Sequence, residues 1–124
     1  MATTYVRMYS DEDGESHFET LEVEFREVDY APPADPMFVS DLEDATRAGF
    51  VMAVPGPLGD WHPTPVRQYM IPVSGEFEVT VTDGSKRRIG PGRPLLLEDK
   101  TGRGHYTEVV SEEPAVVAVI HLPD

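Results

Sequence analysis

The chain has 124 residues, a length typical of one domain with a single hydrophobic core. It carries 23 acidic and 10 basic residues, and this formal net charge of −13 argues against binding to nucleic acid or anionic membranes, because both need a basic face. The absence of cysteine excludes disulfides, thiolate metal ligands and a cysteine nucleophile. Neither a signal peptide nor a long apolar span is apparent, so we expect a cytoplasmic protein.

Short runs of valine, threonine and aromatic residues, separated by proline and glycine, predict an all-β domain. Residues 76–82 alternate between apolar and polar and are followed by the hairpin signal Asp83-Gly84, whereas residues 115–120 are apolar on both faces and predict a central or interface strand. Residues 11–15 and 31–36 are typical of exposed connections. Residues 40–48 begin like a capped helix but are short enough to form a loop or a single turn. In chain order, the expected strands are 4–8, 17–28, 49–54, 68–73, 76–82, 94–97, 106–110 and 115–122.

A first motif lies between Gly56 and Gly75 and contains His62, Thr64 and Gln68. Alternate residues of an extended strand face the same side, so these three even-numbered side chains are expected to point into one cavity. By the same parity, the neighbouring residues 67 and 69 are expected to face away from it. The prolines at 63 and 65 limit regular strand pairing to residues 67 onward.

A second motif begins at Gly92, continues through three leucines at 95–97, and ends in Gly102-Arg103-Gly104-His105. Two residues separate Gly102 from His105 at this end of the motif.

These two motifs, residues 56–75 and 92–109, resemble the two conserved motifs of the cupin superfamily. The family's first motif has a second histidine where this chain has Thr64 and a glutamate where it has Gln68. In the second motif, Glu98 replaces a common proline, the following loop is longer, and Val109 replaces a common asparagine. The resemblance implies a single cupin domain spanning residues 1–124, with the double-stranded β-helix of an RmlC-like jelly roll.

The resemblance also implies a metal site formed by His62, Gln68 and His105, for iron, manganese, nickel or zinc. Two neutral imidazoles and an amide are expected to hold a divalent ion less tightly than three imidazoles and a carboxylate. The alternative is that both histidines only form hydrogen bonds in a pocket without metal. The sequence therefore leaves open whether this site binds a metal.

Four further residues are candidates for substrate binding: Thr64, His17, Trp61 and Arg103. His17 would supply a third imidazole or a ligand contact if its strand reached the barrel mouth, and otherwise is a structural or surface residue. Trp61 is either a stacking wall or a core anchor, and Arg103 either binds an anionic group or is a solvated loop residue.

Residues 98 and 99 are both acidic. One of them could act as a general base or as a hydrogen-bond partner for His105; the alternative is that both are solvated loop residues. His121 is expected to be structural or to lie at a dimer contact.

The first hypothesis for function is a cupin that binds a small organic molecule in the barrel, with a metal assisting an oxygenase, isomerase, lyase or cyclase reaction. The second is a non-catalytic ligand-binding or sensory cupin with a degenerate metal site. Metal-free epimerase-like chemistry is a third, but it needs a histidine facing a tyrosine, and the parity of Tyr69 and Tyr106 argues against both. We also expect a homodimer formed through edge strands, with residues 115–122 or the N-terminal strand as candidates.

Overall fold

The structure of the chain is a computed structural model that describes residues 2–124. These residues form β-strands and no helix, so no helix of this range is long and apolar enough to cross a membrane. The strands are β1 (Thr4–Ser10), β2 (Ser16–Glu22), β3 (Arg26–Val28), β4 (Met37–Val39), β5 (Arg47–Ala53), β6 (Gly56–Pro57), β7 (Gln68–Ser74), β8 (Phe77–Val81), β9 (Lys86–Ile89), β10 (Leu95–Glu98), β11 (His105–Val109) and β12 (Ala115–His121).

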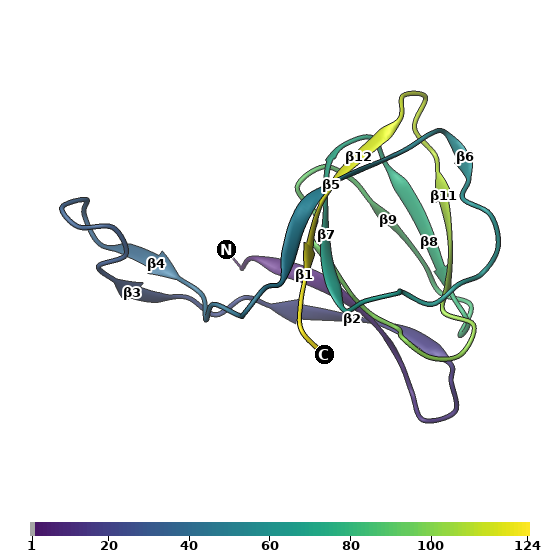
Figure 1. Ribbon diagram of the computed structural model, residues 1–124, viewed down its shortest axis with the longest axis horizontal. Coiled ribbons are helices and arrows are strands. Elements are labelled where there is room, and N and C mark those ends of the chain that lie inside the picture. Colours follow the sequence, from purple (N-terminus) through teal and green to yellow (C-terminus); the bar gives the residue numbers. More distant parts are fainter. Residues whose placement is uncertain (1) are drawn as a thin grey trace.

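The last eight strands wind as a double-stranded β-helix (Figure 1). The antiparallel pairs β8–β9, β7–β10, β6–β11 and β5–β12 are nested along the chain. Successive pairs alternate between a four-stranded sheet of order β6-β11-β8-β9 and a six-stranded sheet of order β2-β1-β10-β7-β12-β5. This alternation is the strand order of a jelly roll, and it confirms the all-β, double-stranded β-helix expected from the sequence.

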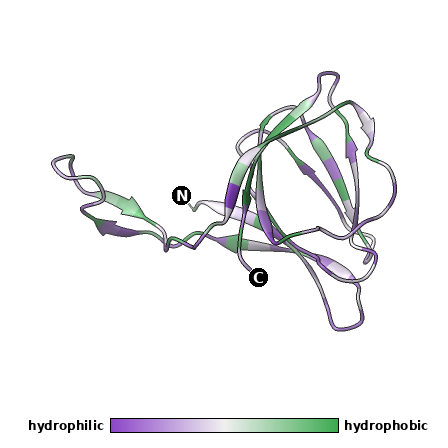
Figure 2. Cartoon of the chain, viewed as in Figure 1, coloured by the Kyte–Doolittle hydropathy of each residue, from purple (hydrophilic) through white to green (hydrophobic). Residues whose placement is uncertain are grey.

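The hydrophobic core lies between the two sheets because one face of each strand is apolar. In β8, Phe77, Val79 and Val81 are buried while the residues between them are partly exposed, as the alternating pattern predicts. Figure 2 shows hydrophobic segments along the strands of the barrel. The remaining core side chains include Met8, Ile89, Leu95, Leu97, Val109, Ala115, Val117 and Val119.

The N-terminal strands extend the six-stranded sheet. β1 pairs parallel with β10 and antiparallel with β2, so β1 is an interior strand. β12 lies between β7 and β5, which confirms its expected central position. Neither β12 nor β1 is therefore free at an edge, and the suggestion that one of them is an exposed dimer edge is wrong.

The segment from residue 23 to residue 46 departs most from the sequence prediction. The expected strand 17–28 is two strands, because the chain leaves the sheet after Glu22 and β3 pairs instead with β4. We call residues 26–39 the arm; it projects from the barrel on the side of β5 (Figure 1). Residues 40–46 form no helical turn, and Arg47 already pairs with His121.

Two other short strands, β6 and β9, were also missed by the prediction, because a proline-rich pair and a run of basic residues carry little strand signal. The turns at residues 11–15 and 83–84 are confirmed by the backbone hydrogen bonds from Gly14 N to Asp11 O, 3.1 Å, and from Gly84 N to Val81 O, 3.1 Å.

Candidate functional site

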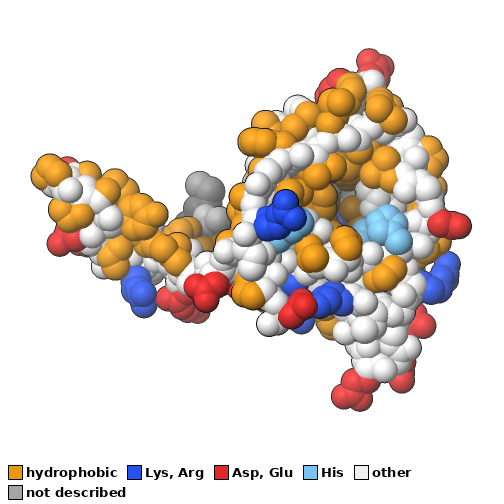
Figure 3. Space-filling model, in the orientation of Figure 1, with side chains coloured by type: hydrophobic (Ala, Val, Ile, Leu, Met, Phe, Trp, Pro, Cys, Tyr) orange, Lys and Arg blue, Asp and Glu red, His pale blue; other side chains and the backbone are white. Residues whose placement is uncertain are grey.

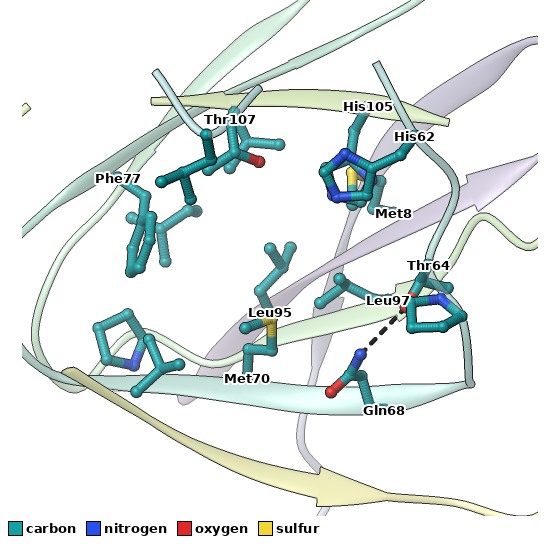
Figure 4. A pocket seen from close by; sticks show the side chains of 16 residues that line it. Met8, His62, Thr64, Gln68, Met70, Phe77, Leu95, Leu97, His105 and Thr107 are labelled. Carbon is teal, nitrogen blue, oxygen red and sulfur yellow. Dashed lines mark hydrogen bonds between the residues drawn. The ribbon is translucent and has the colours of Figure 1, made fainter. Parts of the chain in front are cut away.

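A cavity of about 170 Å³ lies inside the barrel between the two sheets. Figure 3 shows hydrophobic side chains gathered in a hollow of the barrel. The polar residues of its lining are His62, Thr64, Gln68, His105 and Thr107 (Figure 4). The apolar residues are Met8, Leu58, Pro65, Met70, Pro72, Phe77, Val79, Ile89, Leu95, Leu97 and Val117. The cavity is thus a mainly apolar chamber with a few hydrogen-bonding groups.

Two histidines from the two motifs meet at this cavity, with their ring centroids 4.7 Å apart. Their backbones form an antiparallel bridge, in which each amide donates to the other's carbonyl oxygen at 3.0 Å. Gly104 makes this approach possible: it has φ +74°, and a Cβ there would lie 2.2 Å from the carbonyl oxygen of His62. His62 is exposed at the mouth, whereas His105 is buried, 5% exposed.

His105 is oriented by a buried carboxylate. Its Nδ1 lies 2.6 Å from Asp99 Oδ2, and Asp99 is fully buried. An ionised carboxylate can only accept, so Nδ1 carries the proton and Nε2 presents its lone pair. Asp99 Oδ1 is the one side-chain N or O atom of residues 2–124 that is sealed from solvent without a hydrogen-bond partner. Of the two acidic residues predicted as partners for His105, the structure selects Asp99.

His62 has the same tautomer for a different reason. Its Nδ1 donates to the backbone carbonyl of Asp60 at 2.9 Å, which leaves Nε2 as an acceptor. Both imidazoles at the cavity therefore have Nδ1 engaged and Nε2 without a hydrogen-bond partner among the described residues. Two neighbouring acceptors favour a ligand group that donates hydrogen bonds, or a cation.

Thr64 and Gln68 line the cavity as the parity argument predicts, but they are tied to each other. Gln68 Nε2 donates to Thr64 Oγ1 at 3.1 Å, and that hydroxyl donates to the carbonyl oxygen of Val66 at 2.7 Å. In Figure 4, the amide oxygen of Gln68 points away from Thr64. Within residues 2–124, no group of three or more His, Cys, Asp or Glu side chains is arranged to hold a metal. The predicted metal ligands thus include only two strong donors, His62 and His105.

A charged network lies on the outer face of β1, β7 and β10, opposite the cavity. Arg67 and Arg7 each donate to the carboxylate of Glu98, and Tyr69 donates to Glu43 at 2.7 Å. Burial alone raises the pKa of Glu98, but the two arginine hydrogen bonds outweigh it and leave that pKa below its ordinary value. Burial, followed by the Glu43 carboxylate, raises the pKa of Tyr69. Residues 67 and 69 therefore face away from the cavity, and Glu98 links two arginines on the outer face of the sheet.

Trp61 and Arg103 lie together outside the cavity lining. The Arg103 guanidinium stacks over the Trp61 ring at 4.4 Å, and Trp61 contacts Tyr106 with ring centroids 6.1 Å apart. Tyr106 follows His105 on β11 and faces the other side of that strand, and Trp61 packs against it there; neither Trp61 nor Arg103 lines the cavity. Trp61 and Arg103 are therefore not among the residues that line the cavity, and their contact with a ligand stays a prediction.

His17 is also not among the residues that line the cavity, and its contact with a ligand stays a prediction. Phe18 packs against the core, so His17 faces the opposite side of β2, where its Nε2 lies 2.7 Å from Asp11 and its Nδ1 lies 3.0 Å from Asp83. Hydrogen bonds to Asp11 first and then to Asp83 raise the pKa of His17. This cluster connects the 11–15 turn with the β8–β9 turn.

Sequence reasoning missed Thr107 and most of the apolar lining. Thr107 follows His105 by two residues on β11, so the parity rule applied to the second motif would have found it. Met8 and Leu58 come from distant segments with no motif, and only the tertiary arrangement brings them to the cavity.

No protein-family model and no curated protein matches this sequence. Among solved structures, one similar chain is the cupin domain of an XRE family transcriptional regulator from Enterobacter cloacae, at 24% identity over 62% of this chain and 81% of that chain, with a TM-score of 0.48. Another is a putative ethanolamine utilization protein Q from Salmonella typhimurium, at 15% identity over 99% of this chain and 98% of that chain, with a TM-score of 0.46. The nested strand pairs and the two glycine-framed motifs that meet at the cavity give this chain the double-stranded β-helix of the cupin fold.

Proposed function

We propose that this protein binds a small, mainly apolar organic molecule inside the barrel, with a hydrogen-donating group held at His62 and His105. The observation that carries the proposal is the pair of unpartnered Nε2 atoms at one side of an apolar cavity. The two rings act as acceptors, so an O–H or N–H group of the ligand would satisfy them.

The size of the cavity limits the ligand. A volume of about 170 Å³ is close to that of an apolar cavity of about 150 Å³ that accepts benzene. We therefore infer a ligand the size of a single ring or a short branched chain. Its apolar part would be covered by side chains such as Met70, Leu95 and Val117.

The charge of the lining also limits the ligand. No lysine or arginine is among the described residues that line the cavity, so a buried carboxylate or phosphate would lack a permanent positive partner. A neutral, weakly acidic group such as a phenol, an enol or an alcohol fits better. If the protein is an enzyme, the Asp99 carboxylate behind His105 would stabilise the imidazolium that forms when His105 accepts a proton from such a group.

Three ring compounds of similar size test this proposal. Phenol carries the donor, toluene replaces the hydroxyl with a methyl group, and benzoate is anionic. We expect NMR titration to show that phenol binds more tightly than toluene and benzoate. In His62→Phe, phenol affinity should fall roughly twofold to tenfold while toluene affinity is retained, which is the range of one net hydrogen bond.

Tyr106→Phe is the matched control. Tyr106 follows His105 in the chain, but its ring packs against Trp61 outside the cavity, so this substitution removes a hydroxyl that does not face the ligand. Its phenol affinity should equal that of the wild type. Equal binding of phenol and toluene, or binding of none of the three, would contradict the proposal.

A second candidate uses the same two histidines to hold a divalent metal. Both Nδ1 atoms are engaged, and a carboxylate stands behind His105, which is a common arrangement around metal-bound imidazoles. His62 and His105 would be the main ligands, with the Gln68 amide oxygen as a weaker third. A bound metal would act as a Lewis acid on a ligand oxygen.

Elemental analysis of protein purified without a histidine tag separates the two candidates. It is measured before and after chelation, and after reloading with iron, manganese, nickel or zinc. About one equivalent of a metal that is lost in His105→Ala would establish the second candidate. Phenol binding that is the same in chelated and reloaded protein would support the first candidate alone.

A further inference from the structure

A second concave region lies on the outer face of the six-stranded sheet. It is a groove of about 610 Å³, which is larger than the barrel cavity and within the size range of small-molecule sites. The alternation of β7 separates the two spaces: Gln68 and Met70 line the cavity, whereas Tyr69 and Ile71 line the groove. No described residue lines both, so the groove is a distinct site on the other side of the sheet.

The floor of the groove is aromatic and apolar. Tyr5 of β1 and Tyr69 of β7 lie edge to face, with ring centroids 6.0 Å apart and ring planes at 64° to each other. The ring faces of tyrosine attract cations, and pairs or cages of aromatic rings recognise quaternary ammonium groups. The apolar residues that complete the lining include Ile71, Pro94, Ile120 and Leu122.

The walls of the groove carry negative charge. One wall is the end of β2 and the residues after it, and the other is the segment that connects the arm with β5 (Figure 1). No lysine, arginine or histidine is among the described residues of the lining. Two arginines outside the lining pair with Asp41 and Glu43, each at 3.3 Å, and one of them is shared with Glu98. The acidic residues of the lining are Glu22, Glu24, Asp41 and Glu43.

Glu43 joins the wall to the floor. The hydroxyl of Tyr69 donates to Glu43 Oε2 at 2.7 Å, and Arg67 donates to Glu43 Oε1 at 3.3 Å. These bonds hold the connecting segment against the sheet. A phenol that donates to a carboxylate is also more electron-rich, which strengthens the attraction of its ring face for a cation.

We propose that this groove binds a small organic cation with an apolar body, such as an aryl or alkyl quaternary ammonium. The cationic group would lie against Tyr5, Tyr69 and the acidic walls, and the apolar part would cover Ile71 and Ile120. Both oxygens of Glu43 are already engaged, which favours a cation that needs no directed hydrogen bond. An anion would find no positive partner in the lining. The proposal does not depend on what the barrel cavity binds.

Three benzyl compounds of similar size test the proposal by NMR titration. Benzyltrimethylammonium is cationic, N-benzylacetamide is neutral and phenylacetate is anionic. We expect the cation to bind more tightly than the other two, with an affinity that falls as sodium chloride is added. The amide signals of Tyr69 and Ile71 should shift on binding, while that of Thr107 in the barrel cavity should not.

Two substitutions separate the aromatic from the electrostatic contribution. Tyr5→Leu keeps an apolar side chain but removes a ring, and Glu43→Gln removes a charge. Each should weaken binding of benzyltrimethylammonium roughly twofold to fivefold. Glu43 is exposed in a loop, so Glu43→Gln should fold even if the partly buried Tyr5 proves necessary for folding. Tyr106→Leu and Glu108→Gln on β11 are the matched controls and should keep wild-type affinity, because neither residue lines the groove.

The same titrations contain the results that would overturn the proposal. One is equal binding of the three compounds, and another is wild-type affinity in both Tyr5→Leu and Glu43→Gln. Loss of cation binding in His62→Phe would place the cation in the barrel instead. Tighter binding of a lysine-rich peptide would assign the groove to a protein partner, and cation binding that weakens as the protein is concentrated would assign it to a second copy of the chain.

Discussion

The Asp99 carboxylate accepts a hydrogen bond of 2.6 Å from Nδ1 of His105, and this contact decides which nitrogen of the buried histidine faces the cavity as an acceptor. The carboxylate is fully buried, and its second oxygen has no partner. Burying a carboxylate without a partner costs folding free energy. The hydrogen bond to His105 offsets part of this cost, and it also fixes the tautomer of the imidazole.

Asp99→Asn should reverse the role of His105 at the cavity. The amide of asparagine donates to Nδ1, so the ring proton moves to Nε2 and the acceptor becomes a donor. We expect phenol affinity to fall roughly tenfold and toluene affinity to stay unchanged. The ¹⁵N shifts of the histidine ring report the tautomer independently of binding.

Asp60→Asn is the control for this substitution, because His62 uses only the backbone carbonyl of Asp60. It should change neither phenol affinity nor the tautomers. An unchanged His105 tautomer in Asp99→Asn would show that Asp99 does not determine it.

Gly104→Ala should disrupt the contact between the two motifs. A Cβ at this position would lie 2.2 Å from the carbonyl oxygen of His62, and its φ of +74° disfavours any L-residue with a side chain. We expect a loss of unfolding free energy on the order of 3 kcal/mol, measured by urea denaturation.

Gly84→Ala is the control that separates the cost of the backbone conformation from the cost of a steric clash. Gly84 has φ +94°, but nothing lies within 4 Å of a Cβ placed there. Its cost should be about 1 kcal/mol, from the backbone conformation alone. Equal losses in the two variants would contradict the close approach of His62 to Gly104.

His17 should stabilise the protein within a limited pH range. The pKa of His17 is raised in the folded protein. The stabilisation that His17 provides is therefore fully present at pH values below its unfolded-state pKa, and it is lost as the pH rises through its folded-state pKa. The lowered pKa values of Asp11 and Asp83 mean that their contribution is lost as the pH falls. The pKa of Asp11 is lowered chiefly by the hydrogen bond from His17, and that of Asp83 chiefly by Ser85.

We therefore expect His17→Gln to lower the melting temperature more near about pH 5.5 than near about pH 9, by a small amount because the cluster is partly exposed. Differential scanning calorimetry at several pH values measures this difference. A melting temperature difference that does not depend on pH would show that the charge of His17 contributes nothing.

Glu98→Gln should destabilise the outer face of the six-stranded sheet, because Arg7 and Arg67 would lose their shared carboxylate. We expect a loss on the order of 1 to 2 kcal/mol at neutral pH. The folded pKa of Glu98 lies below its ordinary value, so the stability advantage of the wild type is present above the ordinary pKa and disappears as the pH falls through the folded pKa.

Urea denaturation at neutral and acidic pH measures the difference for Glu98→Gln. Glu22→Gln is the control, because Glu22 forms no ion pair within residues 2–124. A loss in Glu98→Gln that persists at acidic pH would assign the effect to packing instead of charge.

The sequence by itself determined the strand character of the barrel and which face of the first motif points inward. Residues 62, 64 and 68 line the cavity and residues 67 and 69 face away, because the alternation of side chains along an extended chain is a local property. The resemblance of the two motifs to those of the cupin superfamily also predicted that His62 and His105 would meet.

Only the tertiary structure decided the partners of these residues. It paired Asp99 with His105 and Glu98 with two arginines, and it placed His17 between two aspartates outside the cavity lining. It also made β5 an edge and β12 an interior strand. These outcomes depend on register and on which strands become neighbours, which are set by packing between segments distant in the sequence, so a local pattern does not encode them.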